Sequence, residues 1–205
     1  VPLDDNPPWW NAGRVRDQGL DPSCVGHALA AVIDHMRAAA LIEKHAAAAE
    51  GTLDKPYVSA RMLYNLARYH DEWVGEAYSG SSLRGVLKGF FYNGVCPDDE
   101  VERVHEQYRP RRRSPVPQGE DHWLMTRELG IHARNIQLGA YYRVRPRLPD
   151  MHAALNDANA LIVSAYVHGG WKRPGAGATI AFDPTLRQVR AKRQQMHAFA
   201  IIGYD

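Results

Sequence analysis

The sequence reads Gln18-Gly19-Leu20-Asp21-Pro22-Ser23-Cys24 immediately before a long apolar stretch. Apolar residues then recur at helical spacing, with alanines between them, at Leu29, Val32, Ile33, Met36 and Leu41. This pattern predicts a helix from Val25 to about Ala49. Cys24 would lie at its first turn, where the positive end of the helix dipole favours a thiolate. The thiolate is the form that attacks a carbonyl, so Cys24 is a candidate nucleophile.

A second informative segment lies near the other end of the sequence. Residues 196 to 204 read Met-His-Ala-Phe-Ala-Ile-Ile-Gly-Tyr, which is typical of a buried strand and contains His197. An imidazole beside a thiol can serve as its base, so the two segments together indicate a Cys–His pair.

These segments resemble those of papain-like cysteine peptidases, the C1 family, in a divergent and bacterial-type form. The family carries a glutamine six residues before its nucleophile, which is the step from Gln18 to Cys24. Gly80-Ser81-Ser82-Leu83 and Tyr92-Asn93-Gly94-Val95 resemble its substrate-binding glycine loop and the helix behind that loop. Residues 197–204 resemble its histidine strand. The four segments occur in the family's order, and the resemblance covers about residues 10–205.

The resemblance implies an α+β fold with two lobes in one domain, residues 1–205. The left lobe, about residues 10–95, would be helical, with a long central helix that starts at Cys24. A charged insertion would follow at about 96–120. An antiparallel β lobe that carries His197 would cover about 130–205, incomplete at its C-terminus. Apolar periodicity predicts further helices over 58–69, 83–92 and 151–155, with Ser59 as a possible cap of the first. Strands are expected over 160–167 and 196–204, and a Gly/Ala-rich loop over 169–179.

The family's catalytic roles carry over to matching positions. Cys24 would be the thiolate that accepts the acyl group, and His197 would protonate the leaving amine. Gln18 and the backbone N–H of Cys24 would form the oxyanion hole. Gly80 and Ser81 would pair with the backbone of an extended peptide substrate.

Several positions depart from the family pattern C-G-[SA]-C-[WY]. Asp21 stands at the first cysteine, Pro22 at the glycine and Val25 at the aromatic residue, so the disulfide of that first cysteine is absent. The family's orienting asparagine is expected beyond Asp205. Three explanations for the missing asparagine stay open. The chain ends early, a different residue or only a Cys–His dyad serves, or the domain is a scaffold without activity.

The resemblance therefore implies a cysteine endopeptidase that cleaves peptide bonds through a thioester on Cys24. Two other functions stay open. The same pair could pass the acyl group to an amine, as an acyltransferase or amide-modifying enzyme. The domain could also be an inactive papain-fold module that binds a peptide or protein partner.

Composition limits the remaining function classes. The net charge is +2 and no run approaches the ~18 apolar residues of a membrane span, so we expect a soluble protein with no membrane partner. Two cysteines, Cys24 and Cys96, give no disulfide framework, and this scarcity weakly favours a reducing compartment. We expect Cys96 to be a buried apolar residue. The N-terminus has neither methionine nor signal sequence, as in a processed or delivered domain.

We expect no cofactor and no metal, because the histidines lack metal-ligand spacing. His27, three residues after Cys24, is interpreted as packed along the helix. The basic segment 109–117 is interpreted as a solvated loop without aromatic platforms, so a peptide or protein is the expected partner and a nucleic acid is not. Alternatively, this loop crosses the cleft as a lid or is itself cleaved. Oligomeric state is not predicted.

Overall fold

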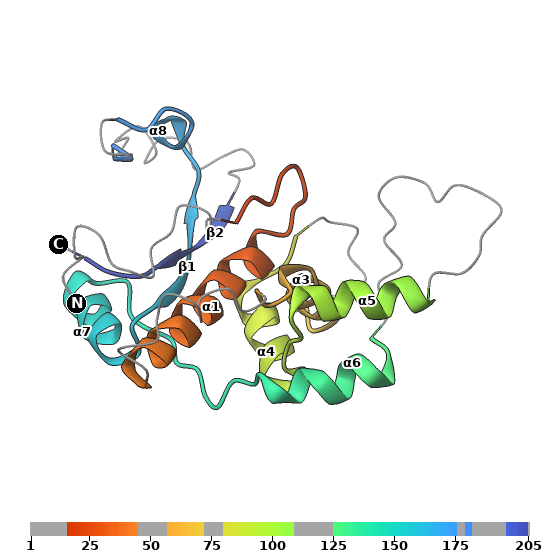
Figure 1. The fold of residues 1–205 in the computed structure, drawn as a ribbon. Coiled ribbons are helices and arrows are strands. Elements are labelled where there is room, and N and C mark those ends of the chain that lie inside the picture. The colour runs from red at the N-terminus through yellow and green to blue at the C-terminus, as the bar shows by residue number, and fades with distance from the viewer. Residues whose placement is uncertain are drawn as a thin grey trace.

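The computed structural model describes residues 16–44, 57–71, 80–108, 125–175, 179–181 and 196–204. The elements in chain order, shown in Figure 1, are α1 (Cys24–Lys44), α3 (Ala60–Tyr69), α4 (Leu83–Asn93), α5 (Asp98–Tyr108), α6 (Arg127–His132), the 3-10 helix η2 (Ala133–Asn135), α7 (Leu148–Ala158), β1 (Leu161–Tyr166), α8 (Gly169–Lys172) and β2 (Met196–Ile201).

Helix α1 is the central element. It packs against α3 on one side and against β2 on the other, while α3 also packs against α4 (Figure 1). The crossing of α1 and α3 is close at Gly26, where a Cβ atom would lie 2.3 Å from the carbonyl oxygen of Ala60. A residue with a side chain therefore does not fit at Gly26 unless the helices separate. The predicted long helix starting at Cys24 is confirmed; residues 45–49 of the predicted range lie outside the described residues.

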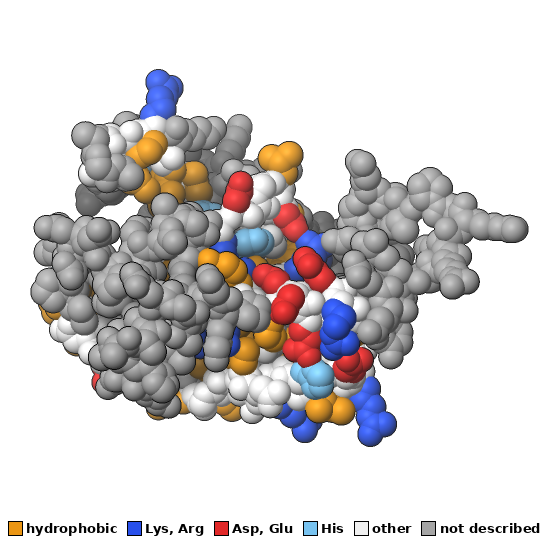
Figure 2. All heavy atoms as spheres, viewed as in Figure 1, with side chains coloured by type: hydrophobic (Ala, Val, Ile, Leu, Met, Phe, Trp, Pro, Cys, Tyr) orange, Lys and Arg blue, Asp and Glu red, His pale blue; other side chains and the backbone are white. Residues whose placement is uncertain are grey.

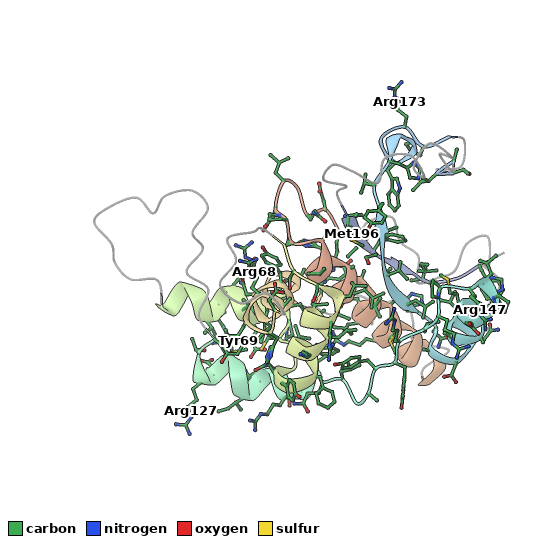
Figure 3. The ribbon with its side chains drawn as sticks, turned by 180° about the vertical axis from the view of Figure 1, so that it is seen from behind. Arg68, Tyr69, Arg127, Arg147, Arg173 and Met196 are labelled. Atoms are coloured by element: carbon green, nitrogen blue, oxygen red, sulfur yellow. The ribbon has the colours of Figure 1, made fainter. Side chains whose placement is uncertain are left out.

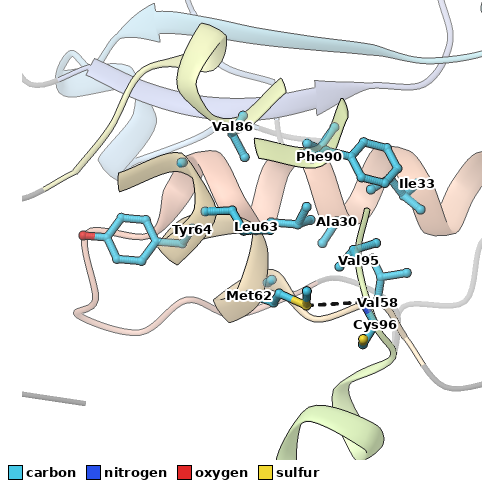
Figure 4. Close-up of a cluster of buried hydrophobic side chains, with 14 of the residues drawn as sticks. Ala30, Ile33, Val58, Met62, Leu63, Tyr64, Val86, Phe90, Val95 and Cys96 are labelled. Atoms are coloured by element: carbon cyan, nitrogen blue, oxygen red, sulfur yellow. Dashed lines mark hydrogen bonds between the residues drawn. The ribbon is translucent and has the colours of Figure 1, made fainter. Parts of the chain in front are cut away.

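The main hydrophobic core lies between these helices (Figure 4). Met62, Leu63, Val86 and Cys96 are fully buried there. The Cys96 N–H donates to the Met62 sulfur at 3.3 Å, and the Cys96 thiol donates to the Leu129 carbonyl oxygen at 3.4 Å. Burial, with a smaller effect of Glu100, raises the pKa of Cys96 to about 12. The expectation that Cys96 is a buried apolar residue is confirmed.

Serine caps fix where two of the core helices begin. The Ser59 hydroxyl accepts from the Met62 N–H at the start of α3, and the Ser82 hydroxyl accepts from the Gly85 N–H at the start of α4. The predicted helices over 58–69 and 83–92 are confirmed within two residues, and Ser59 is a cap as expected.

The sheet consists of β1 and β2 in antiparallel register, with Leu161 opposite Ile201 and Ala165 opposite His197. Helix α7 leads into β1 through Asn159, which has a left-handed φ of 62°. The helix predicted over 151–155 is thus longer than expected. β2 ends at Ile201 rather than at Tyr204, whose ring stacks on His152 of α7 at 3.9 Å.

The charged segment over about 96–120 was predicted to be a surface insertion, and its first part is not one. Its first part is helix α5, in which Val101 and Val104 are buried in the core. α5 is joined to α6 by an ion pair from Arg103 to Glu128 at 2.9 Å and by a contact between the Glu100 carboxylate and Nδ1 of His132. Figure 2 shows the interleaved acidic and basic side chains on this face. The basic segment 109–117, with its interpretation as a loop, lid or cleavage site, lies outside the described residues.

The boundary between the lobes also differs from the prediction. Leu129 and Ala133 are fully buried in the helical core, and the Val95 N–H donates to the carbonyl oxygens of Ala133 and Ile136. Residues 125–138 therefore extend the helical lobe, although the β lobe was expected to begin near residue 130. Helix α8 lies within the expected Gly/Ala-rich loop. Among the described residues the β part is a two-stranded sheet beside α7, so it contains less strand than predicted. None of the helices in the described ranges has the length and apolar character needed to cross a membrane.

Candidate active site

Cys24 is the first residue of α1 and a partly buried free thiol that packs against the core. The residue before it, Ser23, is fully buried, and its carbonyl oxygen accepts from the N–H groups of Gly26 and His27 at 3.0 and 3.1 Å. These bonds close the first helical turn. The Ser23 hydroxyl also lies 3.1 Å from Nδ1 of His27. His27 is therefore held along the helix beside Ser23, as expected from the sequence.

Gln18 lies in a turn directly before Cys24. The Asp21 N–H donates to the Gln18 carbonyl oxygen at 3.2 Å, and the Gln18 side-chain Nε2 donates to the Asp21 carbonyl oxygen at 2.8 Å. Gly19 has a φ of +58°, which favours glycine. The two reciprocal bonds fix the Gln18 side chain relative to the turn. The amide nitrogen of Gln18 carries two hydrogens. The bond to Asp21 uses one of them, and the second can donate to another acceptor.

Asp21 is tied in turn to helix α3. Its carboxylate forms an ion pair with the guanidinium of Arg61, which also lies 5.9 Å from the centre of the Tyr64 ring. Both partners are about one-third exposed. This contact was not foreseen from the sequence. The signal that could have found it is Asp21 itself, an acidic residue where the resembled family has a tethering cysteine.

His197 is the second residue of β2, and its ring lies among aromatic side chains. The Trp171 ring, from α8, meets it edge-on with centroids 6.0 Å apart, and the Phe199 ring stacks on it at 6.4 Å. No hydrogen bond to the imidazole is found among the described residues. The expected asparagine beyond Asp205 stays a prediction. Trp171 was missed because a single aromatic residue after two glycines carries no periodic signal.

Helix α1 and strand β2 are in contact, and one core cluster contains residues from both. Val25, which follows Cys24, and Ala198, which follows His197, are both buried in this cluster. Met196 begins β2 at the end of the sheet that lies near the start of α1 (Figures 1 and 3). The structure therefore brings together the two elements that carry the candidate nucleophile and base.

The loop before α4 approaches the same region. A Cβ atom on Gly80 would lie 3.9 Å from the carbonyl oxygen of Pro22, two residues before Cys24, and the φ of Gly80 is +109°. The Gly80 N–H donates to the Tyr64 hydroxyl at 3.4 Å, and its carbonyl oxygen accepts from Arg68 at 2.8 Å. The Ser81 hydroxyl is buried without a hydrogen-bond partner among the described residues. The N–H and the carbonyl oxygen of Gly80 are thus both hydrogen-bonded to side chains of α3.

Among the described residues, no cluster of three or more His, Cys, Asp or Glu side chains could hold a metal ion.

Comparison with solved structures identifies the fold. The structure superposes on the crystal structure of xylellain, a cysteine protease from Xylella fastidiosa, with a TM-score of 0.66 and 22% sequence identity. The similarity covers 96% of this chain and 68% of that one. The chain has a papain-like fold. No family model matches the sequence, and no curated protein matches it. At 22% identity the comparison establishes the fold.

Proposed function

We propose that this papain-like domain is a cysteine endopeptidase that hydrolyses peptide bonds through a thioester on Cys24. The observation that carries the proposal is the contact between α1 and β2, which bear Cys24 and His197, in a fold similar to that of a cysteine protease. The position at a helix start favours the thiolate, and an imidazolium nearby would favour it further.

The proposed reaction begins with attack of the Cys24 thiolate on the scissile carbonyl carbon. The C–S bond forms as the carbonyl π electrons move to oxygen. His197 then donates its proton to the amine nitrogen as the C–N bond breaks, which leaves an acyl-enzyme. Water, deprotonated by the same imidazole, attacks the thioester and releases the acid and the thiolate. Each step uses only groups of the chain, the peptide and water.

Two donors would stabilise the negative charge that develops on the carbonyl oxygen. The first N–H groups of a helix have no acceptor within the helix, so the N–H of Cys24 is suited to this role. The second is the remaining hydrogen on Nε2 of Gln18, whose side chain is already fixed by its bond to Asp21. Donors that are positioned before the reaction need no reorganisation during it.

Substrate binding would involve the loop before α4. Both backbone groups of Gly80 are hydrogen-bonded within the protein, so pairing with an extended peptide would fall to the backbone of Ser81. Gly80 would then serve by its backbone conformation and its approach to Pro22, and Ser81 by direct contact with the substrate.

Cleavage of a fluorogenic peptide library by the wild type and by C24A tests the proposal. We expect turnover by the wild type, a loss of more than about 10³-fold in C24A, and products that carry a new carboxyl group. Capture of the acyl group by an added amine in preference to water would instead identify a transferase. Peptide binding that is equal in C24A and wild type, without turnover in either, would identify a binding module and contradict the proposal.

A further inference from the structure

We propose that the ion pair between Asp21 and Arg61 positions Gln18 for the oxyanion hole, in place of a covalent tether. The inference rests on the proposed function and goes beyond it, because it assigns a role to two residues that would not touch the substrate. Asp21 and Arg61 are thus positioning residues, and they act through Gln18.

Asp21 makes two hydrogen bonds to Gln18 across the turn. It donates its N–H to the Gln18 carbonyl oxygen, and its own carbonyl oxygen accepts from the Gln18 side-chain amide. Its carboxylate is held by Arg61. A displacement of Asp21 therefore moves the acceptor that orients the Gln18 amide. Through this ion pair, α3 holds Asp21 in place.

Helix α3 is a suitable anchor because it is fixed to α1. The two helices cross closely at Gly26, and α3 contributes Met62, Leu63 and Leu66 to the buried core. Arg61 follows the first residue of α3, and its guanidinium lies near the ring of Tyr64, one turn further along. The hydroxyl of this tyrosine accepts a hydrogen bond from the Gly80 N–H. One turn of α3 therefore contacts both the Gln18 turn and the loop before α4.

An ionic tether differs from a disulfide in ways that can be measured. Because Asp21 and Arg61 are each about one-third exposed, the pair can be broken by removing one charge without leaving a deeply buried ion. The loss of positioning should then lower the rate of acyl transfer while the fold persists. A complete loss of one oxyanion donor lowers kcat by about 10²–10³-fold, and a donor that is retained but poorly oriented should cost less.

The test compares D21N and R61M with the wild type and with R103M. The control removes another partly exposed ion pair, Arg103 to Glu128, which joins α5 to α6. We expect kcat for peptide hydrolysis to fall about tenfold in D21N and R61M, with KM changed less than about twofold, and to stay unchanged in R103M. The exchanged pair, D21R with R61D, should recover most of the loss.

Alkylation of Cys24 by iodoacetamide separates positioning from structural damage. In that reaction the thiolate forms an S–C bond as iodide leaves, and no charge develops on a carbonyl oxygen. We expect the alkylation rate and its pH profile in D21N and R61M to match the wild type. Equal losses of alkylation and hydrolysis, or unchanged kcat in both variants, would overturn the inference.

A third measurement keeps the inference testable if the wild type cleaves no peptide, an outcome that would contradict the proposed function alone. The side-chain ¹⁵N amide of Gln18 should give two well-separated proton resonances in the wild type and in R103M, because one hydrogen is bonded to the Asp21 carbonyl oxygen. In D21N and R61M these resonances should move toward those of a free amide. Identical Gln18 amide spectra in all four proteins would overturn the inference.

Discussion

Val25 and Ala198 are buried in the same hydrophobic core, and each directly follows a proposed catalytic residue in the chain. Their burial fixes the backbone at Cys24 and His197 through apolar packing between α1 and β2. The candidate nucleophile and base therefore depend on the core for their relative position.

Gly26 should be one of the positions most sensitive to added volume. In G26A the new Cβ would lie 2.3 Å from the Ala60 carbonyl oxygen and 2.9 Å from Tyr64, so α1 and α3 must move apart. We expect the free energy of unfolding to fall by about 1–3 kcal/mol, the usual cost of overpacking. Urea denaturation measures it.

Gly130 provides the matched control, since it lies in α6 and a Cβ there would meet nothing within 4 Å. G130A should be stabilised by about 0.5–1 kcal/mol, because alanine favours a helix over glycine. Equal stability of the G26A protein and the wild type would show that the close crossing of α1 and α3 is wrong.

Cys96 should resist modification in the folded protein. Burial raises its pKa from 9.0 to about 12, so the thiol stays protonated where a free cysteine ionises. Titration with a thiol reagent at pH 8 should modify Cys24 alone, and denaturant should expose a second thiol. Rapid labelling of Cys96 in the native protein would contradict its placement beside Leu129.

The same pKa shift makes stability depend on pH. The folded-state pKa lies above the unfolded value, so the contribution of Cys96 to stability is fully present below about pH 9 and is lost as pH rises toward 12. The free energy of unfolding of the wild type should decline over this range. C96A should lack that part of the decline, and a parallel decline in both proteins would assign the effect to other groups.

Trp171 should restrict the orientation of the His197 ring through its edge-on contact at 6.0 Å. Such aromatic pairs contribute about 0.5–1.5 kcal/mol, so we expect W171A to lower kcat by about threefold to tenfold and W171F to lower it less. Peptide hydrolysis measures both. Y92A removes a similar ring from His70 at the exposed end of α4 and should leave kcat unchanged. Equal kcat values for W171A and Y92A would contradict this role.

The elements that were predicted correctly have local signals in the sequence. The start of α1 follows from apolar spacing after Cys24, and α3 and α4 follow from apolar spacing behind capping serines. β1 and β2 are short apolar runs with β-branched or aromatic residues. In α3 and α4 the apolar pattern and the observed burial agree. The strands are less buried than their apolar sequences predict, because β1 has no buried residue and β2 buries only Ala198.

The elements that were missed have few apolar residues of their own. α5 carries Val101 and Val104 among charged side chains, and α6 buries Leu129. Both helices are stabilised by packing against the core of the helical lobe and by the Arg103–Glu128 ion pair between them, which no local window of sequence reveals. The contacts of Asp21 with Arg61 and of Trp171 with His197 join residues far apart in the chain, so they required the structure.

The most direct test of the central claim is the rate of Cys24 alkylation by a haloacetamide from pH 3 to 10, in the wild type and in H197A, with the adduct located by peptide mass. We predict that the wild type is alkylated rapidly at Cys24 at pH values where a free thiol is largely protonated, and that H197A is alkylated much more slowly there. Alkylation with the pH dependence of a free thiol in both proteins, or no labelling until the protein unfolds, would contradict an activated Cys24–His197 pair.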